Sequence, residues 1–220
     1  MKYLLNLVIL VFLMNISLNA QELKTREDSL AYAFGLDLAR EIQNKGMSDL
    51  DTKVMLQAVN DVIKSNDLKM NPVDARTYIA KEKRARKERI SRENRLAGVK
   101  FLEEKSKEEG VMALSDGIYY EILEEGTGPK PPAGSNVTLH YEGRLITGEV
   151  FDSSYERGAP ASFSLNRLIK GWQVAVPNMP EGSKWRIYIP QEMAYGQRGA
   201  GAKIKPYSAL VFDIELIANK

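Results

Sequence analysis

Cysteine is absent from this chain of 220 residues. Its absence excludes disulfide bonds, thiolate nucleophiles and zinc sites built on cysteine. A chain without disulfides is compatible with a reducing cytosol and with compartments outside it, so cysteine usage leaves the location open.

Histidine occurs once, at His140. As the neighbour of Tyr141 on a predicted strand it faces the opposite side, and we expect it to be structural. The sequence also lacks a Gly-x-Ser-x-Gly elbow, a metal-ligand cluster and a phosphate-binding loop, since the glycine-rich segment 196–201 has no following Lys-Ser/Thr. We therefore expect no metal site and no cofactor.

A strong charge imbalance is missing too. The formal net charge is +2, with 44% hydrophobic and 27% charged residues. This composition is that of a globular protein, and the charge is too small to indicate a polyanionic partner by itself.

The first twenty residues have the three-part pattern of a cleavable signal peptide. A short basic start, Met1-Lys2, precedes an apolar run over 3–14, and a polar stretch then ends on the small residue Ala20. The run is short for a membrane span, although Leu18 is large for its place before the cut and leaves an uncleaved anchor as the alternative. We expect export, most simply to the periplasm, with surface attachment or secretion still open.

Three helical segments follow. Apolar residues recur at helical spacing over 28–44 and again over 51–65, and neither short helix can bury its apolar stripe alone. We expect these helices to associate with each other or with a second copy, which predicts a homodimer. A third helix is predicted from Pro72 toward Gly110, with Gly98 as a possible break.

The middle of the third helix, 81–95, holds eight basic and three acidic residues. Such a run can bind nucleic acid, but Glu82–Arg86 and Glu88–Arg92 have the spacing of stabilising pairs on a solvated helix. We favour the solvated connecting helix and expect no nucleic-acid partner.

From Leu114 onward the apolar period becomes two, which is typical of strands. Strands are predicted at 118–123, 137–141, 184–190 and 209–217, with one short helix at 168–176. The fold class is therefore α+β: an all-α association region and a long linking helix, then an antiparallel sheet packed on a short helix. Residues carrying obvious polar chemistry are scarce here, and six aromatic residues stand out that form either a pocket or a plain core: Tyr141, Phe151, Phe163, Trp172, Tyr195 and Phe212.

Five motifs decide between these readings, because they resemble the isomerase domain of FKBP-type peptidyl-prolyl cis/trans isomerases in order and spacing. They are Val137–Gly143, Gly148–Ser154, Leu168–Trp172, Met193–Gly196 and Ala209–Asp213. The region 27–61 is similar, more weakly, to the association domain of the exported, macrophage-infectivity-potentiator-like branch. The resemblance implies a sheet wrapped around a short helix and these divisions: signal peptide 1–20, association domain 21–71, linking helix 72–110 and isomerase domain 111–220.

The resemblance also implies the roles of residues. Trp172 is expected as the floor of a prolyl pocket, while the Ile169 N–H and the Tyr195 hydroxyl bind substrate carbonyls. Asp152 is expected to orient its neighbours and to stabilise the twisted amide. The expected walls are Tyr141, Phe151, Leu168, Ile169 and Phe212. Ala161, at a further wall position, and Ile204, beside the flap, are also expected to bind the substrate.

Two segments depart from the family pattern. Ala161 stands where many members have an aromatic residue, which widens the pocket. The usual Pro-Pro-Asn before the last strand is Lys205-Pro206-Tyr207, which alters the flap beside Ile204. Binding of macrolide inhibitors is therefore expected to be weak, and the residue preferred before proline stays open.

The sequence thus predicts an isomerase that assists the folding of exported proteins and acts on unfolded or partly folded chains containing X-Pro bonds. A rotation barrier of about 18–20 kcal/mol can be lowered by a dry pocket that favours the twisted amide, with no nucleophile or metal. A holdase chaperone with little isomerase activity is the alternative function.

Overall fold

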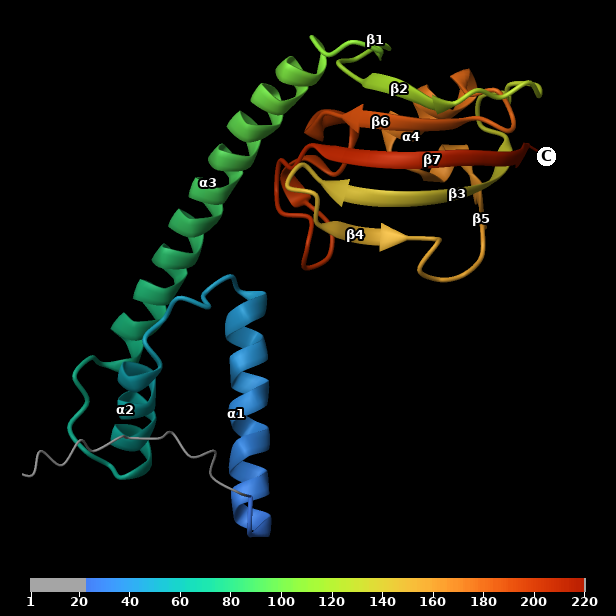
Figure 1. Cartoon of the computed structure of the whole chain (residues 1–220). Coiled ribbons are helices and arrows are strands. Elements are labelled where there is room, and N and C mark those ends of the chain that lie inside the picture. The colour runs from blue at the N-terminus through green and yellow to red at the C-terminus, as the bar shows by residue number, and fades with distance from the viewer. Residues whose placement is uncertain (1–22, 220) are drawn as a thin grey trace, which may run out of the picture. The chain divides into compact units, whose positions relative to one another are not determined.

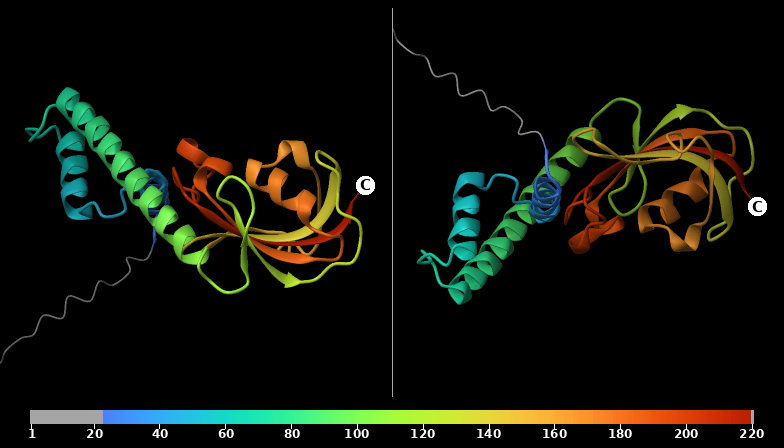
Figure 2. Two further views of the ribbon diagram at one scale, coloured as in Figure 1. Left: turned by 90° about the horizontal axis from the view of Figure 1, so that it is seen from above. Right: turned by 90° about the horizontal axis from the view of Figure 1, so that it is seen from below.

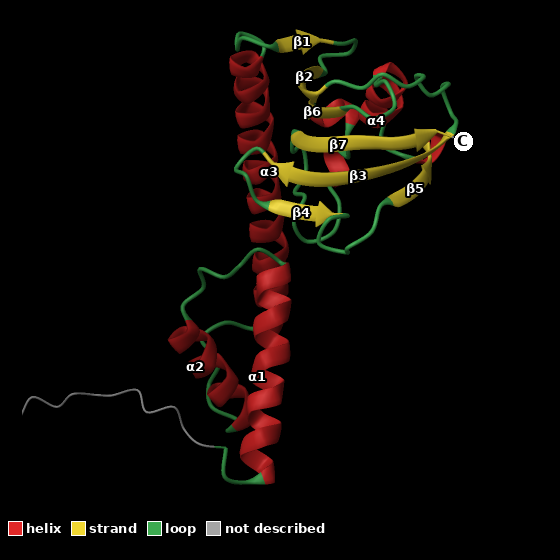
Figure 3. Cartoon of the chain, turned by 45° about the vertical axis from the view of Figure 1, so that its right-hand side comes forward, coloured by secondary structure: helices red, strands yellow, loops and turns green. Residues whose placement is uncertain are grey.

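The computed structural model describes residues 23–219. The predicted signal peptide, residues 1–20, lies outside the described residues. Along the chain, helices come first and strands follow (Figures 1 and 3). Among residues 23–219, none of the helices is long and apolar enough to cross a membrane.

Helices α1 (Arg26–Asn44) and α2 (Thr52–Ile63) match the two short helices that the apolar spacing predicts. A capping box begins α1: the Thr25 hydroxyl accepts from the Asp28 N–H at 3.0 Å, and the Asp28 carboxylate accepts from the Thr25 N–H at 3.1 Å. This arrangement satisfies two N–H groups at the start of the helix. Neither helix contains a buried residue, so their apolar stripes remain open.

Helix α3 (Pro72–Lys105) is continuous through Gly98 and, at 34 residues, measures about 51 Å along its axis. The Asn71 side chain caps it by accepting from the N–H groups of Val73 and Asp74, each at 2.9 Å. Glu88 pairs with Arg84, at 2.9 Å, and not with Arg92 as predicted. The helix ends at Lys105, five residues before the expected limit.

The sheet has seven antiparallel strands in the order β1-β2-β6-β7-β3-β4, with β5 also paired to β3. Their bounds are β1 Val111–Ala113, β2 Tyr119–Glu124, β3 Asn136–Leu145, β4 Val150–Ser153, β5 Ala161–Ser164, β6 Lys184–Ile189 and β7 Leu210–Asn219. Four of these are the predicted strands. The three that the period-two analysis did not identify, β1, β4 and β5, have only three or four residues each.

Helix α4 (Lys170–Ala175) lies against one face of this sheet (Figure 2). The sheet residues that face it alternate along their strands, as in Val137, Leu139 and Tyr141 of β3, and all are buried. A side-chain carbon at Gly171 would lie 2.6 Å from the Ile189 side chain, so the absence of a side chain lets α4 approach β6 closely.

The C-terminal part of α3 packs against residues that do not belong to the core beneath α4. Leu102 joins Tyr188 and Ala209 in a second buried cluster, and Phe101 meets Tyr188 edge to face at 5.9 Å between ring centroids. Gly98 approaches Ala209 so closely that a Cβ at 98 would lie 3.0 Å from the Cβ of Ala209. The glycine that could have broken the helix is therefore a point where the helix comes close to the residue before β7.

Candidate active site

A pocket of about 260 Å³ opens on the face of the sheet that carries α4. Its lining combines apolar rings with a few polar groups and is drawn from β3, β4, β5, β7 and the segments around α4 and Tyr195. The lining residues are Tyr141, Phe151, Asp152, Phe163, Arg167, Leu168, Ile169, Trp172, Tyr195 and Phe212.

Trp172 is the centre of the aromatic part. Three rings meet it edge to face, with centroid distances of 5.2 Å for Phe212, 5.3 Å for Tyr141 and 6.1 Å for Phe163. Edge-to-face contacts are the preferred geometry for aromatic pairs and fix the rings against one another. The Trp172 indole N–H is buried without an acceptor in the described chain, so the floor exposes apolar surface and no hydrogen-bonding atom.

The start of α4 explains how Leu168 and Ile169 reach the pocket. The sequence predicts a helix from 168, but both residues are extended, with ψ of 171° and 150°, and the helix begins at Lys170. As the residue before the helix, Ile169 accepts from the N–H groups of Trp172 and Gln173. Its own N–H makes no hydrogen bond to another described residue and is available to a ligand.

A polar network forms one wall. The Tyr141 hydroxyl donates to Asp152 Oδ2 at 2.6 Å, the Arg157 Nη2 donates to the Tyr141 oxygen at 2.7 Å, and Arg157 also pairs directly with Asp152. Burial acts to raise the pKa of Asp152, but the hydrogen bonds from Tyr141 and Arg157 and the charge of Arg157 outweigh it and hold that pKa below its ordinary value. Burial and the bond to Asp152 raise the pKa of Tyr141, so this phenol stays protonated. The wall is therefore a fixed carboxylate held by two donors.

Tyr195 contributes the second open donor. Its hydroxyl makes no hydrogen bond within the described chain, and its ring is partly exposed at the pocket. Burial, followed by the charge of Asp152, raises its pKa, so the hydroxyl keeps its proton in neutral solution.

Eight of the ten predicted site residues lie together in this lining. The other two are outside it. Ala161 of β5 pairs with Leu139 of β3 and packs against the core, while Ile204 is buried and forms an isolated bridge with Ala200. In this structure they belong to the surroundings of the pocket rather than to its walls.

Three residues at the site were not predicted as site residues. Phe163 was noted only as an aromatic residue, although its alternation with Ala161 in β5 is a signal that could have placed it. Arg167 lies in a 3₁₀ turn (Leu165–Arg167) and Arg157 in the turn after β4, and nothing in their local pattern distinguishes them from solvated arginines.

His140 lies outside the pocket lining, as the strand alternation predicts. Its Nδ1 is 2.9 Å from the Ser154 hydroxyl, and its ring stacks on Tyr155 at 4.5 Å. Ser154 in turn accepts from the Tyr141 N–H at 2.7 Å. The histidine thus supports the backbone that carries Tyr141. Across residues 23–219, no group of three or more His, Asp or Glu side chains is arranged to hold a metal ion.

Two models of known protein families match this chain. The model described as FKBP-type peptidyl-prolyl cis-trans isomerase matches residues 128–217, and the domain amino terminal to that isomerase matches residues 27–122. The chain belongs to the FKBP-type peptidyl-prolyl cis-trans isomerase family, and it is an isomerase of that type.

Its relatives include the FKBP-type 22 kDa peptidyl-prolyl cis-trans isomerase of Escherichia coli, which is 39% identical over 88% of this chain and 95% of its own length. The outer membrane protein MIP of Legionella longbeachae is 34% identical over 92% of this chain and 89% of its own length. Among solved structures, FkpA from Escherichia coli is similar with a TM-score of 0.67 at 34% identity, covering 90% of this chain and 98% of the other. The order of N-terminal helices, antiparallel sheet and short helix is thus shared with that protein.

Proposed function

We propose that the pocket over Trp172 accelerates rotation about X-Pro bonds by taking the prolyl ring out of water and binding the twisted amide more tightly than the planar one. Rotation disrupts amide resonance and reduces the charge separation of the peptide group. A pocket with apolar walls stabilises that less polar form relative to water. Each 1.36 kcal/mol of such differential binding gives about a tenfold rate increase.

In this mechanism the two open donors hold the substrate backbone. The Ile169 N–H and the Tyr195 hydroxyl bind carbonyl oxygens on either side of the rotating bond. The substrate is then fixed at both ends while the amide between them turns. The lack of an intramolecular partner for either donor supports this role, because a donor at a pocket otherwise bonds only to water.

Asp152 has an orienting role in the same proposal. Its carboxylate fixes the phenol of Tyr141, and Arg157 neutralises the pair from the solvent side. The wall then presents a constant electrostatic environment to the amide and does not exchange protons with the substrate. The observation that carries the whole proposal is this combination: an aromatic pocket floored by Trp172 whose polar groups are either locked to one another or open to a ligand.

The test is NMR exchange spectroscopy on a short Phe-Pro peptide with the wild type, Phe151→Ala, Asp152→Leu and the double variant. We expect each single substitution to reduce the catalysed exchange rate about tenfold or more and the double substitution to bring it close to the uncatalysed rate. Wild-type protein that leaves the exchange rate unchanged would contradict the mechanism. Tyr155→Phe is the control, because it removes a hydrogen bond to Glu215 outside the pocket and should keep full activity.

We further propose that the protein acts on exported, partly folded chains as a homodimer formed through residues 21–71, with 72–110 as a linking segment and 111–220 as the catalytic domain. The exposed apolar residues of α1 and α2 support association, since such surfaces are commonly covered by another molecule. Cleavage of a signal peptide near Ala20 and a periplasmic location are part of this proposal. The name of the Legionella relative, an outer membrane protein, supports export.

A further inference from the structure

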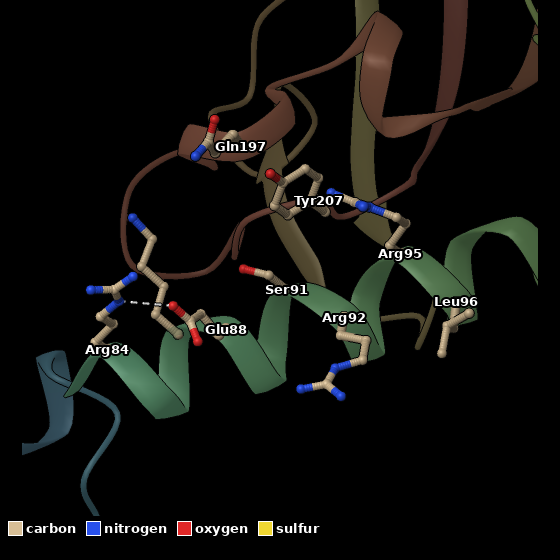
Figure 4. Close-up of a pocket in the computed structure, with 9 residues that line it drawn as sticks. Arg84, Glu88, Ser91, Arg92, Arg95, Leu96, Gln197 and Tyr207 are labelled. Atoms are coloured by element: carbon tan, nitrogen blue, oxygen red, sulfur yellow. Dashed lines mark hydrogen bonds and ion pairs between the residues drawn. The ribbon is translucent and has the colours of Figure 1, made fainter. Parts of the chain in front are cut away.

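A second, larger depression lies between α3 and the segment 196–207. It has a volume of about 550 Å³ and is lined mainly from the helix, with two residues from the loop (Figure 4). The lining residues are Arg84, Lys87, Glu88, Ser91, Arg92, Arg95, Leu96, Gln197 and Tyr207. We refer to this feature as the α3 groove.

The two sides of the α3 groove are joined by specific contacts. The Arg95 guanidinium stacks over the Tyr207 ring, 4.1 Å from its centroid, and the Asn94 amide donates to the Pro206 carbonyl at 2.9 Å. Tyr207 has a φ of 60°, and its N–H donates to the Gly196 carbonyl at 2.8 Å, which closes the loop upon itself. The groove is therefore a formed surface with a fixed width at this end.

Positive charge is concentrated here. Four basic residues and one acidic residue line the groove, a formal charge of 4 − 1 = +3, whereas the whole chain carries +2. Glu88 is paired with Arg84, but Lys87 and Arg92 have no carboxylate partner among residues 23–219. With Arg95, three cations of the groove therefore have no carboxylate partner in the described chain. Lys87 and Arg92 also lack the ring contact that Arg95 makes with Tyr207, so these two are the freest to bind an anionic ligand.

We propose that the α3 groove binds an acidic stretch of the client polypeptide whose X-Pro bond occupies the catalytic pocket. This inference rests on the proposed function and adds a determinant of client choice. A polypeptide fits the lining better than a phosphate polymer does, because Leu96 and the Tyr207 ring offer apolar surface. Ser91 and Gln197 offer hydrogen-bonding groups suited to a peptide backbone, and Glu88 adds a carboxylate that repels continuous negative charge.

One loop connects the two sites. Tyr195 lines the pocket and Gln197 lines the groove, so their Cα atoms are at most about 7.6 Å apart. Arg84 and Leu96 are twelve positions apart on α3, roughly 18 Å along the helix. An extended peptide of about five or six residues covers that length, so acidic residues within about ten positions of the proline can reach the groove.

The experiment compares three peptides that share a central Phe-Pro and differ in a flank of four Glu, four Gln or four Lys, placed on either side of the proline. We expect the wild type to show a lower KM for the Glu peptide than for the Gln peptide. In Lys87→Glu/Arg92→Glu this preference should fall about threefold to tenfold, with kcat nearly unchanged, because two exposed charge pairs are lost. The same variant should prefer the Lys peptide.

Arg76→Glu/Lys81→Glu is the matched control, since it changes the net charge of the same helix equally without touching the groove. Loss of the preference in both double variants, or no preference in the wild type, would overturn the proposal. Fluorescence anisotropy of a labelled Glu-rich peptide without proline tests the groove even if isomerase activity is absent, so failure of the proposed function is seen separately. Tighter competition by polyphosphate or DNA than by the peptide at physiological salt would also overturn it.

Discussion

Regular apolar patterns occur both in the short helices α1 and α2 and in the sheet. The apolar side chains of the sheet are buried, but those of the two helices are exposed. Leu139, Ile214 and Leu216 of the sheet are fully buried, whereas Phe34 of α1 is 70% exposed and Ile63 of α2 is 74% exposed. The catalytic domain satisfies its apolar pattern within the chain. The short helices leave theirs unsatisfied. Periodicity therefore shows that a face needs covering, but it does not say whether the same chain supplies the cover.

Removing the helices is the strongest way to break this comparison. A chain lacking residues 21–71 should change from dimer to monomer in sedimentation and keep its activity on short Phe-Pro peptides, because the catalytic core lies elsewhere. An unchanged oligomer would refute the role of α1 and α2. Equal suppression of client aggregation by the truncated and the full chain would show that a holdase function does not need these helices.

A truncated side chain in the buried core should have the next largest effect. Leu139→Ala removes a fully buried side chain from the middle of β3 and should lower the free energy of unfolding by about 2–5 kcal/mol, measured by urea denaturation. The proposed dimer should persist under native conditions. A loss below about 1 kcal/mol would mean that the core around Leu139 adjusts in ways that this structure does not indicate.

A truncated side chain on the exposed face of α1 should affect association and not the stability of the sheet. Phe34→Ala should weaken the dimer by about 2 kcal/mol, as an aromatic residue at an interface does, and leave the urea unfolding of the catalytic domain unchanged. Sedimentation over a concentration series measures the first effect. Equal dissociation constants for wild type and variant would exclude Phe34 from the interface. Lys53→Ala, a polar change on α2, serves as a control.

The last prediction concerns the junction between α3 and the sheet. Burial, followed by the charge of Glu121 and a hydrogen bond to it, raises the pKa of Tyr188 to about 12. A raised folded-state pKa stabilises the protein below the unfolded value of about 10, and this stability is lost as the pH rises through 12. The stability difference between wild type and Tyr188→Phe should therefore narrow between pH 10 and 12. A difference that stays constant over this range would contradict the raised pKa.

The sequence predicted those parts of the fold that long, regular patterns encode. The helices that begin near 26, 52 and 72 and the four longer strands were placed within a few residues. The strands β1, β4 and β5 were not, since three or four residues hold too few alternations to recognise. The start of α4 was also set two residues early, because Leu168 and Ile169 continue the apolar run of the helix although their backbone is extended.

The residues of the site likewise fall into those that the sequence predicted and those that it did not. Ordered motifs brought eight residues of the pocket together, including Asp152 and Trp172, because each motif lies on or beside a core element. Arg157 was missed, since its contact with Tyr141 joins a turn to a strand across 16 positions and leaves no periodic trace. Ile204 and Ala161 were expected to bind the substrate but lie outside the pocket lining, because the local pattern does not determine whether such residues face a cavity or the core behind it.

The close approach of Gly171 to Ile189 has a further consequence, for how such a pocket can vary. Trp172 follows Gly171 directly, so the depth of the pocket is set where α4 and β6 are already in contact, and any residue larger than glycine at 171 would push the helix away from the strand. Its width is set instead by side chains on β4, β5 and the loop at Tyr195, which border solvent and can change size without moving the helix. Changes in substrate range on this scaffold would then come from residues at the rim, which alter the width of the pocket, while its depth at Trp172 stays the same.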